Sequence, residues 1–357
     1  MLFDPRPKTS KNDLYNFDRE FEELVKNVEK PMVVVSGLRR TGKTSLVLTA
    51  LSEYDNPYIF IDLREGFQSY RDLYQLLSRG VNDFVSRISR RERLRELLLK
   101  GLKRLRGVSL AGLSVSFSWG KDRFLLTEFF GMLDDLGERI GEKVVIVFDE
   151  FQRSGGSIGL TLHNAIAYSY DYYRNLSFIL TGSEMGVLYG ILRNTGNPLY
   201  GRAFIEIRTR KLGRSESIDF LEKGFKEAGK KVPRKEIDIV VDELDGIIGW
   251  LTYYGYLRVS GNGDFMEIKR GAVELARIEL ENFLRGRVSR RYRLVLKLLT
   301  EGVKEWSLLK RSLEKAEGRE LSDRVVYEIL QQLKTHSIID EENNFTDPVI
   351  GEASKNI

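Results

Sequence analysis

The chain is poor in the side chains that many enzymes use, since it contains no cysteine and only two histidines among 357 residues. The absence of cysteine excludes disulfide bonds, thiolate zinc sites and a cysteine nucleophile. The histidines, His163 and His336, are too few for a histidine-rich metal site, and any Ser/His/Asp triad would depend on one of them. The groups available for catalysis or ligand binding are therefore mainly carboxylates, lysine, arginine, hydroxyl groups and backbone amides.

Long hydrophobic runs are also missing. No run approaches the roughly 18 apolar residues that span a bilayer. The segment 1–8 carries charges and two prolines where a signal peptide needs an unbroken apolar stretch. We therefore expect a cytoplasmic protein with no membrane partner.

Length and charge set broad limits on the fold and on partners. A chain of 357 residues is too long for one compact core and predicts two or three domains. Its 57 Lys and Arg against 52 Asp and Glu give a net charge of +5, so the surface as a whole is only mildly basic.

Five short apolar runs have the pattern of buried strands in a parallel sheet, because they do not alternate with polar residues. Segments of helical length separate them, which predicts an α/β domain. Residues 108–119 differ, since they alternate around Ala111 and Gly112 and predict a hairpin inserted between helices. The five runs are 32–35, 58–61, 144–148, 176–180 and 203–207.

The chain changes character after Leu212, where the strand signals fade. Residues 213–286 predict a small helical domain. Residues 287–357 predict three short helices and a hairpin with a turn at Asn343 and Asn344, which is a winged-helix pattern. The expected helices are 215–228, 234–244 and 265–284 in the first part, and 288–300, 305–316 and 321–335 in the second.

The sharpest motif fits G-x-x-x-x-G-K-[ST] and stands between a buried strand and a helix. In such a loop, backbone N–H groups and the N-terminus of the helix bind phosphate. Lys43 would reach the β- and γ-phosphates of a nucleotide, and the Thr44 hydroxyl would ligate Mg²⁺. The predicted nucleotide-binding residues are Gly37, Leu38, Arg39, Arg40, Thr41, Gly42, Lys43, Thr44 and Ser45.

A second strand, 144–148, ends in Asp149 and Glu150. We expect Asp149 to hold Mg²⁺, usually through water, and Glu150 to orient or deprotonate the attacking water. Acidic residues are also common at the start of a helix that follows a strand, so the functional interpretation depends on the phosphate loop upstream.

Four segments together resemble the archaeal AAA-like ATPases, which belong to the signal-transduction (STAND) ATPases and are related to AAA+ proteins. The C-terminal segment 345–350 and the segment 15–24 ahead of the loop are also similar to that family. The resemblance implies an ATPase domain over 1–212 with a basic helix and hairpin insert at about 87–120, a helical lid over 213–286 and a winged helix over 287–357. The four segments are Gly37–Leu46, Val147–Gln152, Ile179–Ser183 and Pro198–Arg202.

The resemblance also implies a sheet in the order 5-1-4-3-2 and two further catalytic residues. Ser183, or Thr181, would be the polar sensor of the γ-phosphate. Arg202 would stabilise charge on the transferred phosphoryl group, either in its own subunit or across a subunit boundary.

Two details of the nucleotide site stay open in the sequence. The lid of this family usually carries a Gly-x-Pro turn, whereas the segment 245–250 has no proline, which puts the contact between lid and nucleotide in doubt. Tyr15 and Phe17 have the chemistry to stack on adenine, although aromatic residues at this spacing more often belong to a core.

The segments around the phosphate loop are consistent with two functions. The first is a Mg²⁺-dependent ATP switch, in which nucleotide binding closes the lid and winged helix over the phosphate site. It would act through self-association or through a protein partner that the sequence does not reveal. A metabolic kinase would share the loop but is a poorer match to the Glu150 base.

The second function is an ATP-regulated DNA-binding protein that resembles replication-initiator ATPases. The basic run 87–106 and the arginines of 285–293 favour nucleic acid. A solvated face of an amphipathic helix explains the basic run better than nucleic acid does, and the acidic wing segment 340–342 would repel a DNA backbone.

Overall fold

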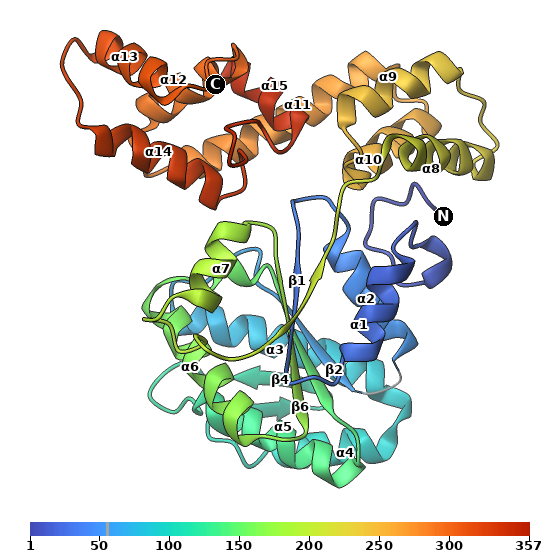
Figure 1. Ribbon diagram of the computed structural model, residues 1–357. Helices are drawn as coiled ribbons and strands as arrows, with labels where there is room; N and C mark the ends of the chain where they lie inside the picture. The colour runs from blue at the N-terminus through green and yellow to red at the C-terminus, as the bar shows by residue number, and fades with distance from the viewer. Residues whose placement is uncertain (55–56) are drawn as a thin grey trace.

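The computed structural model describes residues 1–54 and 57–357 and has a five-stranded parallel sheet at its centre (Figure 1). The strands lie in the order β2-β5-β6-β1-β7. Numbered along the chain, this order is 2-3-4-1-5, which is 5-1-4-3-2 counted from the other edge. The expected α/β fold and sheet order are therefore confirmed. The strands are β1 (Met32–Ser36), β2 (Tyr58–Asp62), β5 (Val144–Asp149), β6 (Leu176–Gly182) and β7 (Ile205–Arg208).

Both faces of the sheet are covered by helices, which explains why its central strands are buried along their whole length and mostly apolar. Alternate residues of β1 enter different cores. Val33 and Val35 pack with α1 and α2, whereas Met32 and Val34 pack with α3, α5 and α6 on the other face. These helices are α1 (Asp18–Asn27), α2 (Lys43–Glu53), α3 (Tyr70–Arg87), α5 (Leu126–Ile140) and α6 (Gly156–Tyr172), and α7 (Met185–Arg193) follows β6.

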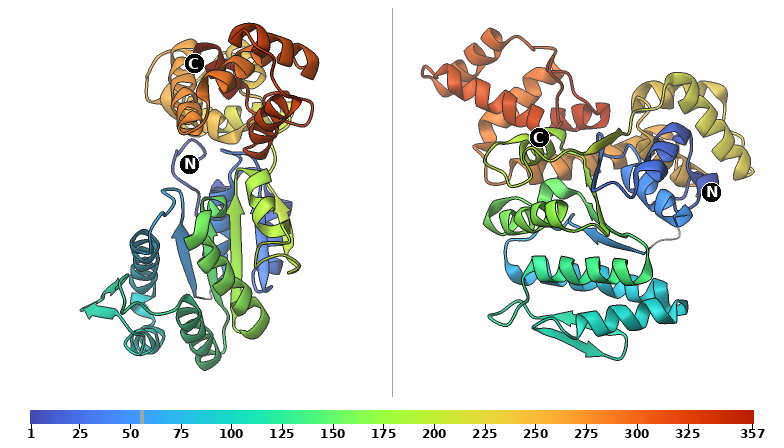
Figure 2. Two further views of the ribbon diagram at one scale, coloured as in Figure 1. Left: turned by 90° about the vertical axis from the view of Figure 1, so that its left-hand side faces the viewer. Right: turned by 60° about the horizontal axis from the view of Figure 1, so that its bottom comes forward.

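The basic insert consists of helix α4 (Glu92–Leu102) and the antiparallel hairpin of β3 (Val108–Ala111) and β4 (Ser114–Phe117). In Figure 2 it lies at the end of the molecule opposite the winged helix. Leucines of α4 are buried against the sheet domain, and some of the surrounding cations pair with acids, as Lys100 does with Glu96. The insert is thus a packed amphipathic helix with a charged outer face.

The lid, residues 213–286, contains one helix more than the sequence predicts. Helix α10 begins at Ile248 and is rich in aromatic and glycine residues, so it lacks the regular apolar spacing that marks an amphipathic helix. Trp250, Leu251 and Tyr254 are buried. The four helices are α8 (Arg214–Glu227), α9 (Arg234–Leu244), α10 (Ile248–Val259) and α11 (Phe265–Leu284).

The centre of the lid core is occupied by a residue from the other end of the chain. Phe3 is fully buried and contacts Phe220 and Phe225 edge-on. Gly224 and Gly255 leave room for its ring, since a Cβ at either position would lie within 2.4 Å of a ring carbon. The first residues of the chain are therefore part of the lid.

The winged helix, residues 287–357, has the three predicted helices, but its wing is reduced to a single antiparallel bridge between Ile339 and Phe345. A short helix that the sequence did not predict, α15, packs against α11, so lid and winged helix share one hydrophobic core. Figure 1 shows both at the end of the sheet to which β1 leads. The helices are α12 (Ser289–Thr300), α13 (Trp306–Glu317), α14 (Asp323–Thr335) and α15 (Pro348–Ala353).

The boundaries at residues 212 and 286 stay predictions, since the lid core extends to Phe3 on one side and into the winged helix on the other. Within residues 1–54 and 57–357, no helix is both long and apolar enough to cross a membrane.

Candidate nucleotide site

The phosphate loop joins β1 to α2, so it lies at the edge where the parallel strands end. Its two glycines are required by geometry. Gly42 has φ +87°, a conformation that other residues rarely adopt, and a Cβ on Gly37 would lie 2.2 Å from Thr209 Oγ1. Thr41 Oγ1 donates to Leu38 O at 2.7 Å, which stabilises the loop internally.

Lys43 lies at the start of α2 and is 4% exposed. Its Nζ donates to Gly37 O at 3.0 Å and to Leu38 O at 2.6 Å, so the ammonium group lies over the first turn of the loop. Burial lowers the pKa of Lys43 to about 8, partly offset by the nearby charges of Glu150 and Asp149. A buried cation at this position is suited to an anionic ligand.

The side-chain oxygens of Thr44 and Asp149 lie side by side next to the loop. Thr44 Oγ1 donates to Asp149 Oδ2 at 3.0 Å, and Thr181 Oγ1 donates to the other carboxylate oxygen. Burial raises the pKa of Asp149, although both hydroxyl donors oppose the shift. A hydroxyl and a carboxylate side by side fit Mg²⁺, which prefers hard oxygen ligands and retains several waters.

Glu150 is turned away from β5 by a left-handed backbone, with φ +57°. Its N–H donates to Thr181 Oγ1 at 3.0 Å, which holds this conformation. Ser183 Oγ donates to Glu150 Oε2 at 2.7 Å, and Gln152 Nε2 donates to the same oxygen. Glu150, Thr181 and Ser183 are thus brought together, and their roles in hydrolysis stay predictions. Gln152 had no predicted role, although its motif had been singled out.

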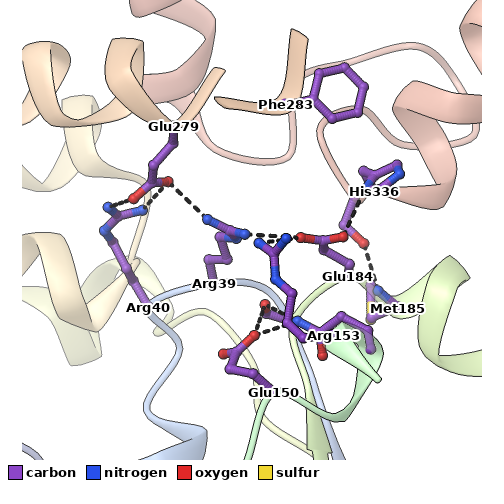
Figure 3. Close-up of polar contacts among 12 residues, drawn as sticks. Arg39, Arg40, Glu150, Arg153, Glu184, Met185, Glu279, Phe283 and His336 are labelled. Atoms are coloured by element: carbon purple, nitrogen blue, oxygen red, sulfur yellow. Dashed lines mark hydrogen bonds and ion pairs between the residues drawn. The ribbon is translucent and has the colours of Figure 1, made fainter. Parts of the chain in front are cut away.

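The two arginines of the loop bind acidic residues from distant parts of the chain (Figure 3). Arg39 contacts Glu184 at 2.9 Å and Glu279 of α11 at 3.4 Å. Arg40 also contacts Glu279, and its guanidinium lies 3.9 Å from the centre of the Trp250 ring. Both arginines therefore connect the loop to the lid.

Glu184 is the centre of this network and is nearly buried. It also pairs with Arg153 at 3.0 Å and accepts a 2.6 Å hydrogen bond from His336 Nδ1 in the winged helix (Figure 3). On the other side of the His336 ring, Arg287 lies 3.1 Å from Nε2, so the histidine connects Glu184 to a second residue of the winged helix.

The environment of Glu184 keeps it charged. Burial opposes the charge, but the hydrogen bond from His336 and the charges of Arg153 and Arg39 together lower the pKa of Glu184 from 4.5 to about 2. A lowered pKa means that these contacts stabilise the folded protein above about pH 4.5, and that this contribution is lost as the pH falls toward 2.

No motif in the sequence predicts this network as a site. The one local signal is that Glu184 and Arg153 directly follow predicted motifs. Glu279 lies on α11 and His336 directly after α14, each more than 140 residues from its partner, Arg40 or Glu184, and neither belongs to a motif.

The lid meets the loop in spite of the missing proline. Gly249 N–H at the start of α10 donates to Arg40 O at 2.9 Å, and a Cβ on Gly249 would lie 2.6 Å from Arg40 Cβ. Trp250 Nε1 then donates to Asp347 of the winged helix at 2.8 Å. The backbone of α10 thus contacts the phosphate loop directly, without a Gly-x-Pro turn.

A cavity of about 360 Å³ opens beside the loop, between the N-terminal segment 4–8 and α10. Its volume is in the range of small-molecule sites. Lys8 N–H donates to Ser45 Oγ at 3.1 Å and closes one wall. Tyr15 also lines the cavity, but its hydroxyl is bonded to α8, and Phe17 is buried in the core beside α2.

Arg202 lies at the other edge of the sheet. Its guanidinium donates to Ala167 O at 3.2 Å and pairs with Asp171, both on α6. Since β7 runs parallel to β1, residues before β7 lie where the strands begin, whereas the phosphate loop lies where they end. Within one chain Arg202 is therefore separated from Lys43, and its role across a subunit boundary stays a prediction.

Two family descriptions match the sequence. The family described as ATPase domain predominantly from Archaea matches residues 16–253. The family described as MCM protein C-terminal winged helix-turn-helix domain matches residues 287–345. None of the curated proteins matches the chain.

Several solved structures are similar to this fold. The Walker-type ATPase Paby2304 of Pyrococcus abyssi is 33% identical, with a TM-score of 0.80 over 99% of this chain and 100% of that one. Cdc6p from Pyrobaculum aerophilum is 13% identical, with a TM-score of 0.48 over 99% and 97% of the two chains. Aeropyrum pernix ORC1, solved in complex with DNA, is 14% identical, with a TM-score of 0.45 over 96% and 92%.

Proposed function

Because this chain belongs to the family of ATPase domains predominantly from Archaea and hydrolyses ATP, we propose that it works as a Mg²⁺-dependent molecular switch. In this proposal, the state of the nucleotide decides whether the lid and the winged helix stay bound to the phosphate loop. The observation that carries it is that one carboxylate, Glu184, binds an arginine of the loop and a histidine of the winged helix at the same time.

ATP would lie in the cavity beside the loop, with its phosphates over the N-terminus of α2. Lys43 and the loop N–H groups would bind the β- and γ-phosphates. Thr44 and Asp149 would hold Mg²⁺, which when bound neutralises charge on the phosphate oxygens. The segment 4–8 and α10 would enclose the base.

Hydrolysis would proceed by attack of water on the γ-phosphorus. Glu150 accepts a proton from the water as the new P–O bond forms and the bond to the bridging oxygen breaks, so that ADP leaves with the electron pair. Ser183 holds Glu150 through Oε2 at 2.7 Å and lies at the same end of the sheet as the loop. In this proposal Ser183 would also be the sensor of the γ-phosphate, the role that the family resemblance implies.

The coupling to the winged helix follows from the charges around Arg39. In the structure its guanidinium is shared between Glu184 and Glu279. A γ-phosphate next to Lys43 would compete for this cation, because a phosphate carries more charge than a single carboxylate. Withdrawal of Arg39 would leave Glu184 with less positive charge around it and would weaken its link to the winged helix. This direction is opposite to the closing on nucleotide binding that is expected from the sequence, because in the structure the winged helix is already docked beside the loop.

The contacts near His336 suggest what is released. Met185 N–H at the start of α7 donates to Ser337 Oγ at 3.0 Å, and Gly186 lies against the backbone of Thr335. The C-terminal end of α14 is thus docked on the ATPase domain next to Glu184. Loss of the Glu184 contacts would free this end of the helix.

We expect Glu184→Gln to loosen the winged helix without preventing ATP binding. The amide keeps the size of the side chain but loses its charge, so Arg39, Arg153 and His336 are held less tightly. The measurement is the distance between spin labels at Leu125→Cys and Tyr327→Cys, both exposed positions in a chain that has no other cysteine. The variant should give a broader distance distribution without nucleotide.

In the same labelled protein, a non-hydrolysable ATP analogue with Mg²⁺ should change the distance in the wild-type sequence. Glu142→Gln, which removes a partner of Arg91 far from the loop, serves as a matched control and should leave the distribution unchanged. A wild-type distribution that is identical with and without the analogue would refute the switch.

The alternative function is an ATP-regulated DNA-binding protein, and the match of residues 287–345 to an MCM winged helix favours it. The charges of α14 speak against it. Arg324 pairs with Glu328, and Lys334 pairs with Glu341, so cations of the helix that would read DNA already have acidic partners.

Gel shifts with duplex DNA distinguish the two functions. The switch predicts no retardation at low salt, with or without an ATP analogue. Duplex binding that weakens steeply with salt would instead support the DNA-binding function, because each phosphate contact releases counterions.

A further inference from the structure

Gln152 lies in the proposed hydrolytic site, although its amide side chain is neither an acid, a base nor a nucleophile. It lies two residues after Glu150, in the short helical segment Phe151–Arg153, and is 5% exposed. Its Nε2 donates to Glu150 Oε2 and, at 3.1 Å, to Ser183 Oγ. Glu150, Gln152 and Ser183 therefore form a closed triangle of hydrogen bonds.

The orientation of the Gln152 amide follows from its partners. Glu150 can only accept, and Ser183 uses its proton to donate to Glu150 Oε2, so both atoms that face Gln152 require a donor. The NH₂ group of the amide must therefore point at them. A reversed amide would set a carbonyl oxygen against the carboxylate.

This orientation leaves the other end of the amide without a partner. Gln152 Oε1 is buried and has no hydrogen bond among the residues that the structure describes. It faces Gly182, where a Cβ would lie 2.9 Å from it. An orphaned buried acceptor destabilises a fold, and an apolar residue of similar size would avoid that cost. Stability alone does not account for a glutamine here.

Gln152 Nε2 and Ser183 Oγ both donate to the same oxygen of Glu150, Oε2. Within residues 1–54 and 57–357, Glu150 Oε1 has no hydrogen-bond donor, and the residue lines the cavity beside the phosphate loop. The left-handed backbone of Glu150 sets the direction in which its side chain leaves the main chain. The hydrogen bonds from Gln152 and Ser183 to Oε2, which together form a clamp, hold the carboxylate at the other end. Oε1 is then the oxygen that remains for water.

We propose that Gln152 is a positioning residue for ATP hydrolysis, which holds Glu150 by Oε2 so that Oε1 is free to accept the proton of the attacking water. The proposal rests on the role of Glu150 as the base. It goes beyond that role in assigning a function to a residue whose hydrogen bonds go to Glu150 and Ser183. Without this clamp, the carboxylate samples orientations in which Oε1 does not meet the water.

The test replaces Gln152 by leucine, which has similar size but no donor. Steady-state hydrolysis should show kcat lowered roughly 10- to 100-fold, the loss expected for a misplaced catalytic group. The KM for ATP and the affinity for a non-hydrolysable analogue should stay within about twofold, because the hydrogen bonds of Gln152 go to Glu150 and Ser183 and not to the phosphate loop or Lys43. The melting temperature should hardly change, since leucine also removes the orphaned oxygen.

Ser154→Ala is the matched control for local packing. Ser154 is buried at the end of the same helical segment, but its Oγ bonds Phe151 O and His163 rather than Glu150. It should leave kcat within about twofold. A purely structural role for Gln152 would instead lower the melting temperature and weaken analogue binding together with kcat, which would overturn the proposal.

A double variant separates this proposal from the role of Glu150. In Glu150→Gln, the further change Gln152→Leu should cost nothing more, because the group that it positions is already gone. Losses that multiply would overturn the positioning role, as would an unchanged kcat in Gln152→Leu alone. Unchanged hydrolysis in Glu150→Gln would refute the base itself.

Discussion

Replacement of Lys43 by alanine is expected to abolish ATP binding. Lys43 is the only cation whose charged group lies directly over the carbonyls of Gly37 and Leu38, among the residues that the structure describes. Its removal leaves the buried end of the phosphate chain without a neutralising charge, next to the carboxylates of Asp149 and Glu150. Calorimetric titration with a non-hydrolysable analogue should show at least a roughly 100-fold loss of affinity.

The pH dependence of binding gives the same prediction a second readout. The pKa of Lys43 is lowered to about 8 by burial, and a bound phosphate would raise it because it favours the charged form. Affinity should therefore be full below about pH 8 and should decline as the pH rises further. Lys43→Ala should lack this decline. Analogue binding in the variant with wild-type affinity would contradict the assignment of the loop.

Replacement of Glu150 by glutamine should separate binding from hydrolysis. The amide keeps the shape of the side chain and the bond from Ser183, but it is no base. We expect analogue affinity to stay within about twofold while kcat falls by roughly 10² to 10⁴, the usual contribution of a general base. Single-turnover hydrolysis, followed by release of phosphate, measures the chemical step directly.

Glu142→Gln is the control for this experiment. It makes the same chemical change at a carboxylate far from the loop, where Glu142 pairs with Arg91, and it should hydrolyse ATP at the normal rate. If Glu150→Gln also hydrolyses ATP at the normal rate, another group removes the proton from water.

The parts of this protein that the sequence predicts best are those whose signal is local. The phosphate loop is eight consecutive residues with a strand before it and a helix after it. The central strands are unbroken apolar runs because both faces of the sheet are covered. The sheet order is a different case, since it came from resemblance to a family and not from any pattern in the runs themselves.

The parts that the sequence did not predict depend on contacts between distant segments. Glu279 and His336 have no motif around them, and only the packing of α11 and α14 brings them to Arg39 and Glu184. Arg202 shows the reverse case, in which a residue in a motif lies at the edge of the sheet away from the loop. Helix α10 was missed because its aromatic residues and glycines obscure the helical period.

Phe3 imposes an order on the folding of the chain. Its neighbour Leu2 donates to Glu227 of α8, 225 residues further along, so the two sides of the lid core leave the ribosome far apart in time. The sheet domain can fold while Phe3 is still exposed to solvent, because the lid helices that bury it have not yet been synthesised. The same segment lines the nucleotide cavity, so the wall of that cavity is completed only when the lid has formed. A nascent chain that stops before the lid therefore has a phosphate loop without a finished pocket, and nucleotide binding is postponed until most of the protein has been synthesised.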